Sequence, residues 1–245
     1  MPRTKAVITD YIGTLVSIRD YQMQTSRKKL FEFLTEVGFQ LNLEEFLYAY
    51  KRSHEKYQRI RYEEFLEITN SVWISEALNS LGCQTDTEDP RLKTAINLFF
   101  HEYLCHLELR PHTKQLLERI SGKFKLGLIS NFTYSPVIYA SLQKLGINQF
   151  FNAILISHDI GYRKPHQKIF LDALRKLQVD PKEAIYLGDS PLEDIKGARA
   201  VGMKTVFVPS QFYSSMDLRE SKQETDFVVK DLGDFLSDLP KILVE

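Results

Sequence analysis

The stretch that decides the fold is Lys5-Ala6-Val7-Ile8-Thr9-Asp10-Tyr11-Ile12-Gly13-Thr14-Leu15, where a short apolar run ends at a carboxylate and a glycine follows closely. A run of this length and β-branched content predicts a buried strand, and the glycine permits a sharp turn and a close approach to a ligand. Asp10 would then lie at the sheet edge where ligands of open α/β sheets bind, as a nucleophile or a metal ligand. Taken alone, the pattern also fits a turn or a helix cap.

Length and composition fit a soluble protein of the cytoplasm. The chain has 245 residues, enough for one large α/β domain or for a core with an insert. Basic and acidic residues number 32 each, so no overall basic field predicts nucleic-acid binding. Cys83 and Cys105 lack metal-ligand spacing and predict reduced thiols. The N-terminus leaves no room for a signal peptide, and no apolar run reaches the ~18 residues of a membrane span, so no membrane partner is expected.

After Leu15 the hydrophobic spacing changes from strand period to helix period for about ninety residues. Four amphipathic helices are predicted there, over residues 26–37, 43–59, 62–81 and 91–106. From Arg110 onward strands alternate with helices, which predicts a parallel sheet covered on both faces. The first strand must join that sheet, because alone it has no partner. We therefore predict an α/β fold: a Rossmann-like parallel-sheet core at residues 1–15 and 110–245, with a helical-bundle cap inserted at 16–109.

Three further strand ends carry polar residues that could meet Asp10. Ser130-Asn131 follows one predicted strand, Lys164-Pro165 follows a second, and Gly188-Asp189 follows a third. Each could be an ordinary turn, cap or solvated residue. The carboxyl ends of parallel strands, however, lie at one edge of a sheet. Four such ends therefore predict one shared site that contains two carboxylates, a hydroxyl and an ammonium group.

These segments together resemble the four motifs of the haloacid dehalogenase superfamily, in order: residues 10–15, 130–131, 164–165 and 188–194. The resemblance spans essentially the whole chain, including the inserted cap. It implies that Asp10 forms a covalent aspartyl intermediate, which divides one difficult displacement into two easier ones. It also implies that Ser130 binds a phosphoryl oxygen, that Lys164 neutralises charge on that group, and that Thr14 and Asn131 orient the ligand and its loop.

The resemblance further implies a Mg²⁺ cofactor. Asp10, the backbone carbonyl of Ile12 and Asp189 would hold the ion, and Asp194 would order the groups around it. A hard cation bound by few carboxylates and several waters suits such a set of ligands.

Ile12 departs from the pattern of the superfamily's phosphatases, which resemble one another in having an Asp two residues after the nucleophile. That Asp protonates the leaving alcohol and activates the attacking water. A positioned acid–base group contributes roughly 10²- to 10⁴-fold to a rate, so an ordinary alkyl phosphate should react poorly here. Either the substrate has a good leaving group, as acyl and aryl phosphates do, or a cap residue supplies the proton. His54 is the candidate for that role.

Three functions remain open on the sequence. The first is a Mg²⁺-dependent phosphohydrolase that acts on a small phosphorylated metabolite through an aspartyl-phosphate at Asp10. The second is a 2-haloacid dehalogenase, in which Asp10 attacks carbon and halide leaves without a proton. Those enzymes need no Mg²⁺ and resemble one another in losing the pair found here as Gly188-Asp189, so phosphoryl chemistry is favoured. The third is a catalytically impaired protein that binds a phosphate ligand. A phosphonate-cleaving enzyme that uses a cap lysine is a further option, although no cap lysine stands out.

The predicted cap helix at 43–59 carries three more candidates. Lys51 and Arg52 could bind a phosphate or carboxylate group of the substrate, beside His54, or could lie on an ordinary solvated face. We expect the cap to open and close over the site and to select a small-molecule substrate. The protein is expected to be a monomer or a homodimer.

Overall fold

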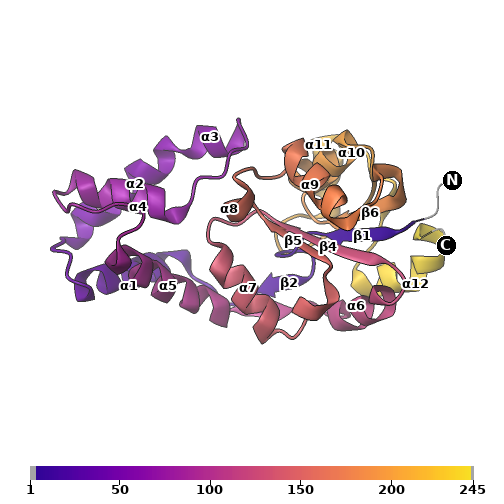
Figure 1. The fold of residues 1–245 in the computed structure, drawn as a ribbon, viewed down its shortest axis with the longest axis horizontal. Helices are drawn as coiled ribbons and strands as arrows, with labels where there is room; N and C mark the ends of the chain where they lie inside the picture. The colour runs from indigo at the N-terminus through magenta and orange to yellow at the C-terminus, as the bar shows by residue number, and fades with distance from the viewer. Residues whose placement is uncertain (1–3, 244–245) are drawn as a thin grey trace.

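The computed structural model describes residues 4–243 and places a six-stranded sheet beside a lobe of helices (Figure 1). The strand order is β5-β4-β1-β6-β7-β8, and every pair of neighbouring strands is parallel. The strands are β1 (Ala6–Thr9), β4 (Lys125–Ser130), β5 (Ala153–Ile156), β6 (Ala184–Gly188), β7 (Lys204–Phe207) and β8 (Phe227–Val228). The predicted α/β class with a parallel sheet is confirmed.

Helices cover both faces of this sheet, with α9, α10 and α11 on one side and α6, α7 and α12 on the other (Figure 1). The helices that follow β3 are α6 (Thr113–Ser121), α7 (Ser135–Lys144), α8 (Ser157–Ile160), α9 (Gln167–Leu177), α10 (Lys196–Ala200), α11 (Ser215–Ser221) and α12 (Leu232–Ile242). A short π-helix, Pro191–Ile195, precedes α10. All four residues of β1 are buried, as expected for a central strand covered on both faces.

Five helices form the inserted lobe: α1 (Met23–Glu36), α2 (Leu43–Lys56), α3 (Gln58–Tyr62), α4 (Asn70–Ser80) and α5 (Pro90–Cys105). Within it α1 packs against α5 and α2 against α4. The chain enters the lobe through β2 (Val16–Ile18) and leaves it through β3 (Leu107–Leu109), which pair in antiparallel fashion. The sequence did not predict this link, because three residues are too few to show a period. Among residues 4–243 no helix is long and apolar enough to span a membrane.

Two other segments differ from the sequence prediction. The helix predicted from residue 62 begins only at Asn70, because residues 65–67 pair with a core loop instead. Leu66 bridges Tyr162, and the Glu67 backbone N–H donates to the Gly161 carbonyl at 2.9 Å. The predicted polar loop at 210–224 contains α11, which begins at a capping box between Ser214 and Asp217.

Candidate active site

The carboxyl ends of β1, β4 and β6 lie side by side and carry the residues that the sequence singled out. Asp10 follows β1, Ser130 ends the adjacent β4, and Asp189 follows β6 on the other side of β1. Lys164 reaches the same place from the loop before α9. All four side chains are buried. The structure therefore brings together the residues of all four motifs.

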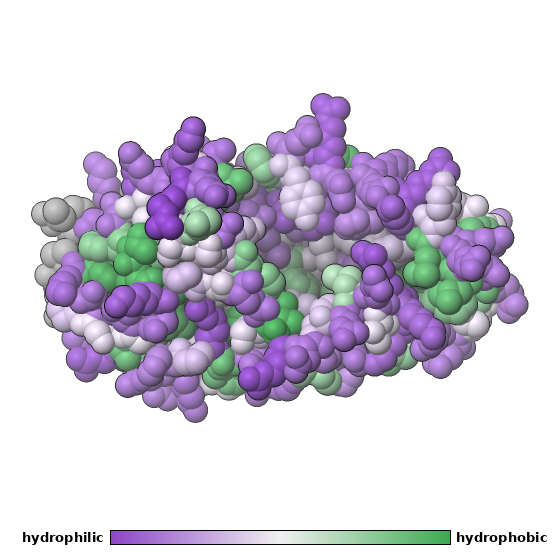
Figure 2. Space-filling view, turned by 180° about the vertical axis from the view of Figure 1, so that it is seen from behind, coloured by the Kyte–Doolittle hydropathy of each residue, from purple (hydrophilic) through white to green (hydrophobic). Residues whose placement is uncertain are grey.

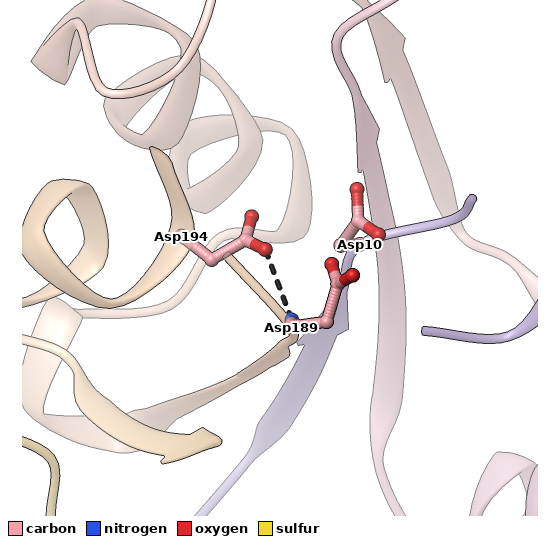
Figure 3. A group of neighbouring side chains, drawn as sticks. All are labelled: Asp10, Asp189 and Asp194. Atoms are coloured by element: carbon pink, nitrogen blue, oxygen red, sulfur yellow. Dashed lines mark hydrogen bonds between the residues drawn. The ribbon is translucent and has the colours of Figure 1, made fainter. Parts of the chain in front are cut away.

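Three carboxylates form the centre of the site (Figure 3). Oxygens of Asp10, Asp189 and Asp194 all lie within 4.8 Å of one another. Two glycines permit this crowding. Gly13 has a φ of +104°, and a Cβ there would lie 2.2 Å from Asp189 Oδ2; a Cβ on Gly188 would lie 2.5 Å from Asp194. A side chain at either position would displace a carboxylate.

Lys164 is the positive partner of this cluster. Its Nζ donates to Asp10 Oδ1 and to Asp194 Oδ1, both at 2.7 Å, and to the Tyr186 hydroxyl at 3.2 Å. Although burial disfavours the ammonium form, the carboxylates of Asp10 and Asp194 raise the pKa of Lys164 well above its ordinary value. Among residues 4–243, Asp10 Oδ2 has no hydrogen-bond partner. The lysine thus holds one oxygen of Asp10 and leaves the other available.

The site carries more negative than positive charge, because three carboxylates face one ammonium. Burial raises the pKa of Asp10 to about 6, against the opposing effect of Lys164. Burial, with the neighbouring Asp10 and Asp194, raises the pKa of Asp189 to about 8. Hard oxygen ligands and uncompensated negative charge are what a divalent cation requires. The donor set therefore fits a divalent metal ion.

Two polar side chains fix the loops around the cluster. Asp194 Oδ2 accepts the backbone N–H groups of Asp189 at 3.1 Å and of Ser190 at 2.9 Å, which holds the turn after β6 in place. The carboxamide of Asn131 accepts the N–H of Lys164 at 2.7 Å and donates to its carbonyl at 2.9 Å. Thr14 is fully buried, and its hydroxyl is unpartnered among the described residues.

Sequence reasoning missed three residues that support this arrangement. The Tyr186 hydroxyl donates to Asp194 Oδ1 at 2.9 Å, the Ser210 hydroxyl donates to Asp189 Oδ2, and the Arg110 guanidinium donates to the Gly13 carbonyl. Ser210 could have been found, because it follows β7 and so occupies one more strand end at the same edge. Tyr186 gave no signal, because a tyrosine inside a strand is typical of a core.

A cavity of about 800 Å³ lies between the helical lobe and the sheet. Figure 2 shows the molecular surface hollowed near its middle, between the two lobes. On the core side the cavity is bounded by Ile12 and Asn131, from the same loops that carry Asp10 and Ser130. Asp10 itself is buried and does not line the cavity. Ile12, two residues after Asp10, therefore presents an apolar side chain to the cavity.

The three cap candidates fall in different places. His54 lines the cavity, and burial, followed by the charges of Arg61 and Arg27, lowers its pKa. Lys51 and Arg52 are exposed and do not line the cavity; Lys51 lies 3.8 Å from Glu55 on the solvent face. The structure therefore does not bring them to the site, because α2 turns the Tyr50 face inward and these two positions outward. The cations that do line the cavity, Arg27 and Arg61, were not predicted.

Fold and carboxylate cluster together define an α/β protein whose parallel sheet has a buried aspartate at the end of β1 and whose chain carries an inserted lobe of helices. The family model described as Haloacid dehalogenase-like hydrolase matches residues 25–208, and the chain belongs to this family.

Curated relatives and solved structures are similar to this chain over much of its length. A glyceraldehyde 3-phosphate phosphatase of Methanopyrus kandleri is 34% identical over 158 residues, which cover 62% of this chain and 67% of the relative. A ribulose-1,5-bisphosphate 5-phosphatase of Halopiger xanaduensis is 27% identical over 224 residues, which cover 88% of this chain and 91% of the relative. A crystal structure of a 2-haloacid dehalogenase of Pseudomonas syringae has a TM-score of 0.65 and 23% identity, with 98% of each chain covered. At that identity the likeness concerns the fold.

Proposed function

We propose that this protein is a Mg²⁺-dependent phosphohydrolase that removes phosphate from a small phosphorylated metabolite. The observation that carries the proposal is the buried cluster of three carboxylates and one lysine at the end of β1. The names of the curated relatives, both phosphatases of small sugar phosphates, support it. In this proposal Asp10, the Ile12 carbonyl and Asp189 hold the ion, and Asp194 orders the turn that carries Asp189.

Asp10 is the proposed nucleophile. One of its carboxylate oxygens attacks phosphorus while the bond from phosphorus to the leaving oxygen breaks, and the electron pair of that bond leaves with the oxygen. Water then attacks the aspartyl-phosphate, which releases inorganic phosphate and restores Asp10. Lys164 orients the nucleophile through Oδ1, and Ser130 donates to a phosphoryl oxygen. The metal ion, when bound, supplies positive charge to the transferring phosphoryl group.

We propose that Thr14 and Asn131 orient the substrate and the loops that carry Asp10 and Lys164. For Asn131 the contacts with the Lys164 backbone support the loop part of that role. The Thr14 hydroxyl has no hydrogen-bond partner among the described residues, so it is available to bind either the substrate or the loop.

The proton for the leaving group is the step that this chain handles differently. Ile12 can neither donate nor accept one, so the proposal favours substrates whose leaving oxygen is already a weak base, such as acyl or aryl phosphates. His54 is the alternative donor, because it lines the cavity. Burial, followed by the charges of Arg61 and Arg27, lowers the pKa of His54, which disfavours the protonated ring that a donor needs.

The dehalogenase alternative is less well supported. Displacement of halide by Asp10 needs no divalent cation, yet the site keeps Asp189 buried beside two other carboxylates at an electrostatic cost. A metal-free reaction gives no reason for that arrangement.

We also propose the division into a core (1–15 and 110–245) and a cap (16–109), a cytoplasmic location, and a monomeric or homodimeric state.

The proposed function is tested by hydrolysis of acetyl phosphate and p-nitrophenyl phosphate with Mg²⁺. We expect turnover that EDTA abolishes and that Asp10→Asn lowers by at least about 10³-fold, since the covalent step is lost. Asp238→Asn, a carboxylate of α12 paired with Lys241 on the surface, is the matched control and should keep full activity. Full activity of Asp10→Asn, or halide release from a 2-chloro acid without metal, would refute the proposal.

A further inference from the structure

The cap side of the cavity contains buried polar atoms that have no hydrogen-bond partner among the described residues. Among residues 4–243, the buried side-chain atoms without a hydrogen-bond partner include Arg27 Nε, Asn70 Oδ1 and Trp73 Nε1, and all three residues line the cavity. Trp73 is 2% exposed and Asn70 is 5% exposed, so water reaches neither freely. Buried polar groups are nearly always hydrogen-bonded, and a group of exceptions at one cavity wall indicates a ligand.

Tyr50 is the nearest internal candidate for these groups. Burial raises the pKa of Tyr50, and the Trp73 N–H and the Arg27 guanidinium nearby oppose the rise. Neither group, however, makes a hydrogen bond of acceptable length and angle to it. The hydroxyl therefore borders the unpartnered donors without satisfying them.

The charged residues that line the cavity differ in their partners: Arg61 is paired with a carboxylate, whereas Arg27 and Asp20 are in no ion pair among residues 4–243. Arg61 pairs with Glu67 at 2.9 Å, and Arg163 pairs with Glu193 at 3.1 Å. Of these four residues only Arg61 lines the cavity, and its charge is already compensated by Glu67. Arg27 has no carboxylate within salt-bridge distance among the described residues and packs its guanidinium on the Tyr50 ring, 5.5 Å from the centroid. A partly buried guanidinium without a counter-charge favours an anionic ligand.

Aromatic rings hold the two cavity arginines so that their edges are available. Arg61 lies 5.4 Å from the centroid of the Trp73 ring, and His54 meets the same ring edge-on at 5.2 Å. A guanidinium stacked on a ring keeps its N–H groups free in its own plane, where they can bind an oxyanion. Burial and the positive charges of Arg61 and Arg27 lower the pKa of His54. The same positive charges would attract an anion bound in the cavity.

We infer that this wall, defined by Arg27, Tyr50, Arg61, Asn70 and Trp73 and here called the Arg27 pocket, binds a second anionic group of the substrate. The substrate class is then a small phosphomonoester that carries a carboxylate or a second phosphate away from the scissile phosphate. This inference rests on the proposed function for the other end of the substrate. A neutral hydroxyl or aldehyde in the same place would leave Arg27 without a counter-charge.

The test uses two phosphonates that no phosphohydrolase can turn over, with the full-length protein in Mg²⁺. Carboxyethylphosphonate carries a second anion, whereas propylphosphonate is similar in length and lacks it. Isothermal titration calorimetry should show that the protein prefers carboxyethylphosphonate by roughly 10- to 100-fold, the range of one charge-assisted hydrogen-bonded contact. Arg27→Gln should abolish that preference and leave binding of propylphosphonate within about twofold.

Lys28→Gln is the matched control, because it removes one positive charge from the next position of α1, on the exposed face. It should keep the preference, which separates a local contact from a general field. Equal affinity of the wild-type protein for the two phosphonates, binding of neither, or an equal loss in Lys28→Gln would overturn the inference. Because no turnover is measured, these outcomes are distinguishable from failure of the proposed reaction, which the acetyl phosphate assay reports.

Discussion

Removing the charge of Asp189 should stabilise the metal-free protein while destroying its metal site. Asp189 lies among Asp10, Asp194 and Ser210, and burial followed by the two neighbouring carboxylates raises its pKa from 3.8 to about 8. In Asp189→Asn the amide oxygen can still accept the Ser210 hydroxyl, and no proton has to be taken up on folding. The variant therefore isolates the electrostatic cost of the third carboxylate.

The direction with pH follows from the sign of this shift. Between pH 4 and pH 8 the folded protein retains a proton on Asp189 that the unfolded chain has already released, so stability falls as pH rises through this window. At 1.36 kcal/mol per pH unit, the interval from 3.8 to 7 corresponds to at most about 4 kcal/mol. For a chain of this length, that difference would raise the melting temperature of the variant over the wild type by at most roughly 8 to 16 °C.

Thermal unfolding in EDTA at pH 5, 7 and 8.5 measures the effect. The difference between Asp189→Asn and the wild-type protein should be small at pH 5 and grow toward pH 8.5. Mg²⁺ should raise the melting temperature of the wild-type protein and leave the variant unchanged. A variant that is less stable than the wild type in EDTA at pH 8.5, or a difference independent of pH, would refute the reasoning.

Two further substitutions test the chemistry and the cap contact. Ile12→Asp restores a proton donor and should raise hydrolysis of an alkyl phosphate by roughly 10²-fold while changing acetyl phosphate hydrolysis little; equal effects on both substrates in kcat measurements would contradict this explanation. Glu67→Gln leaves buried Arg61 without its carboxylate and should lower the free energy of unfolding in urea by roughly 3 kcal/mol. Glu63→Gln, on the exposed face of the same segment, should cost less than about 0.5 kcal/mol, and equal losses would remove the argument.

The core of the site was predictable because a parallel sheet converts chain order into spatial proximity. Asp10, Ser130 and Asp189 each end or follow a short apolar run that predicts a buried strand, and the carboxyl ends of parallel strands share one edge of a sheet. Lys164 was found by the same rule. The supporting contact from Tyr186 was invisible, since its hydroxyl acts from the middle of a strand whose pattern indicates only burial.

The cap was predictable as helices and not as a binding surface. Lys51 and Arg27 both lie on amphipathic helices. The sequence of neither helix shows which of its polar residues face the cavity and which face solvent. That choice depends on how α1 packs on α5 and α2 on α4, which places Arg27 at the cavity and Lys51 in solvent. The start of the predicted third helix was wrong for a related reason. Phe65 adopts a φ of +56°, a conformation that a phenylalanine gives no reason to expect, because the loop is held by the core.

The segment 161–165 connects the helical lobe to Asp10. On its cap side, the Gly161 carbonyl accepts the Glu67 N–H, and the Arg163 N–H donates to the Phe65 carbonyl, each at 2.9 Å. The residue after Arg163, Lys164, is held to Asn131 by its backbone and to Asp10 by its ammonium group. One short loop therefore both contacts the helical lobe and fixes the position of Lys164. A substrate that holds the cap closed through its distal end also stabilises the lysine against the nucleophile, so a truncated substrate should lose turnover as well as affinity.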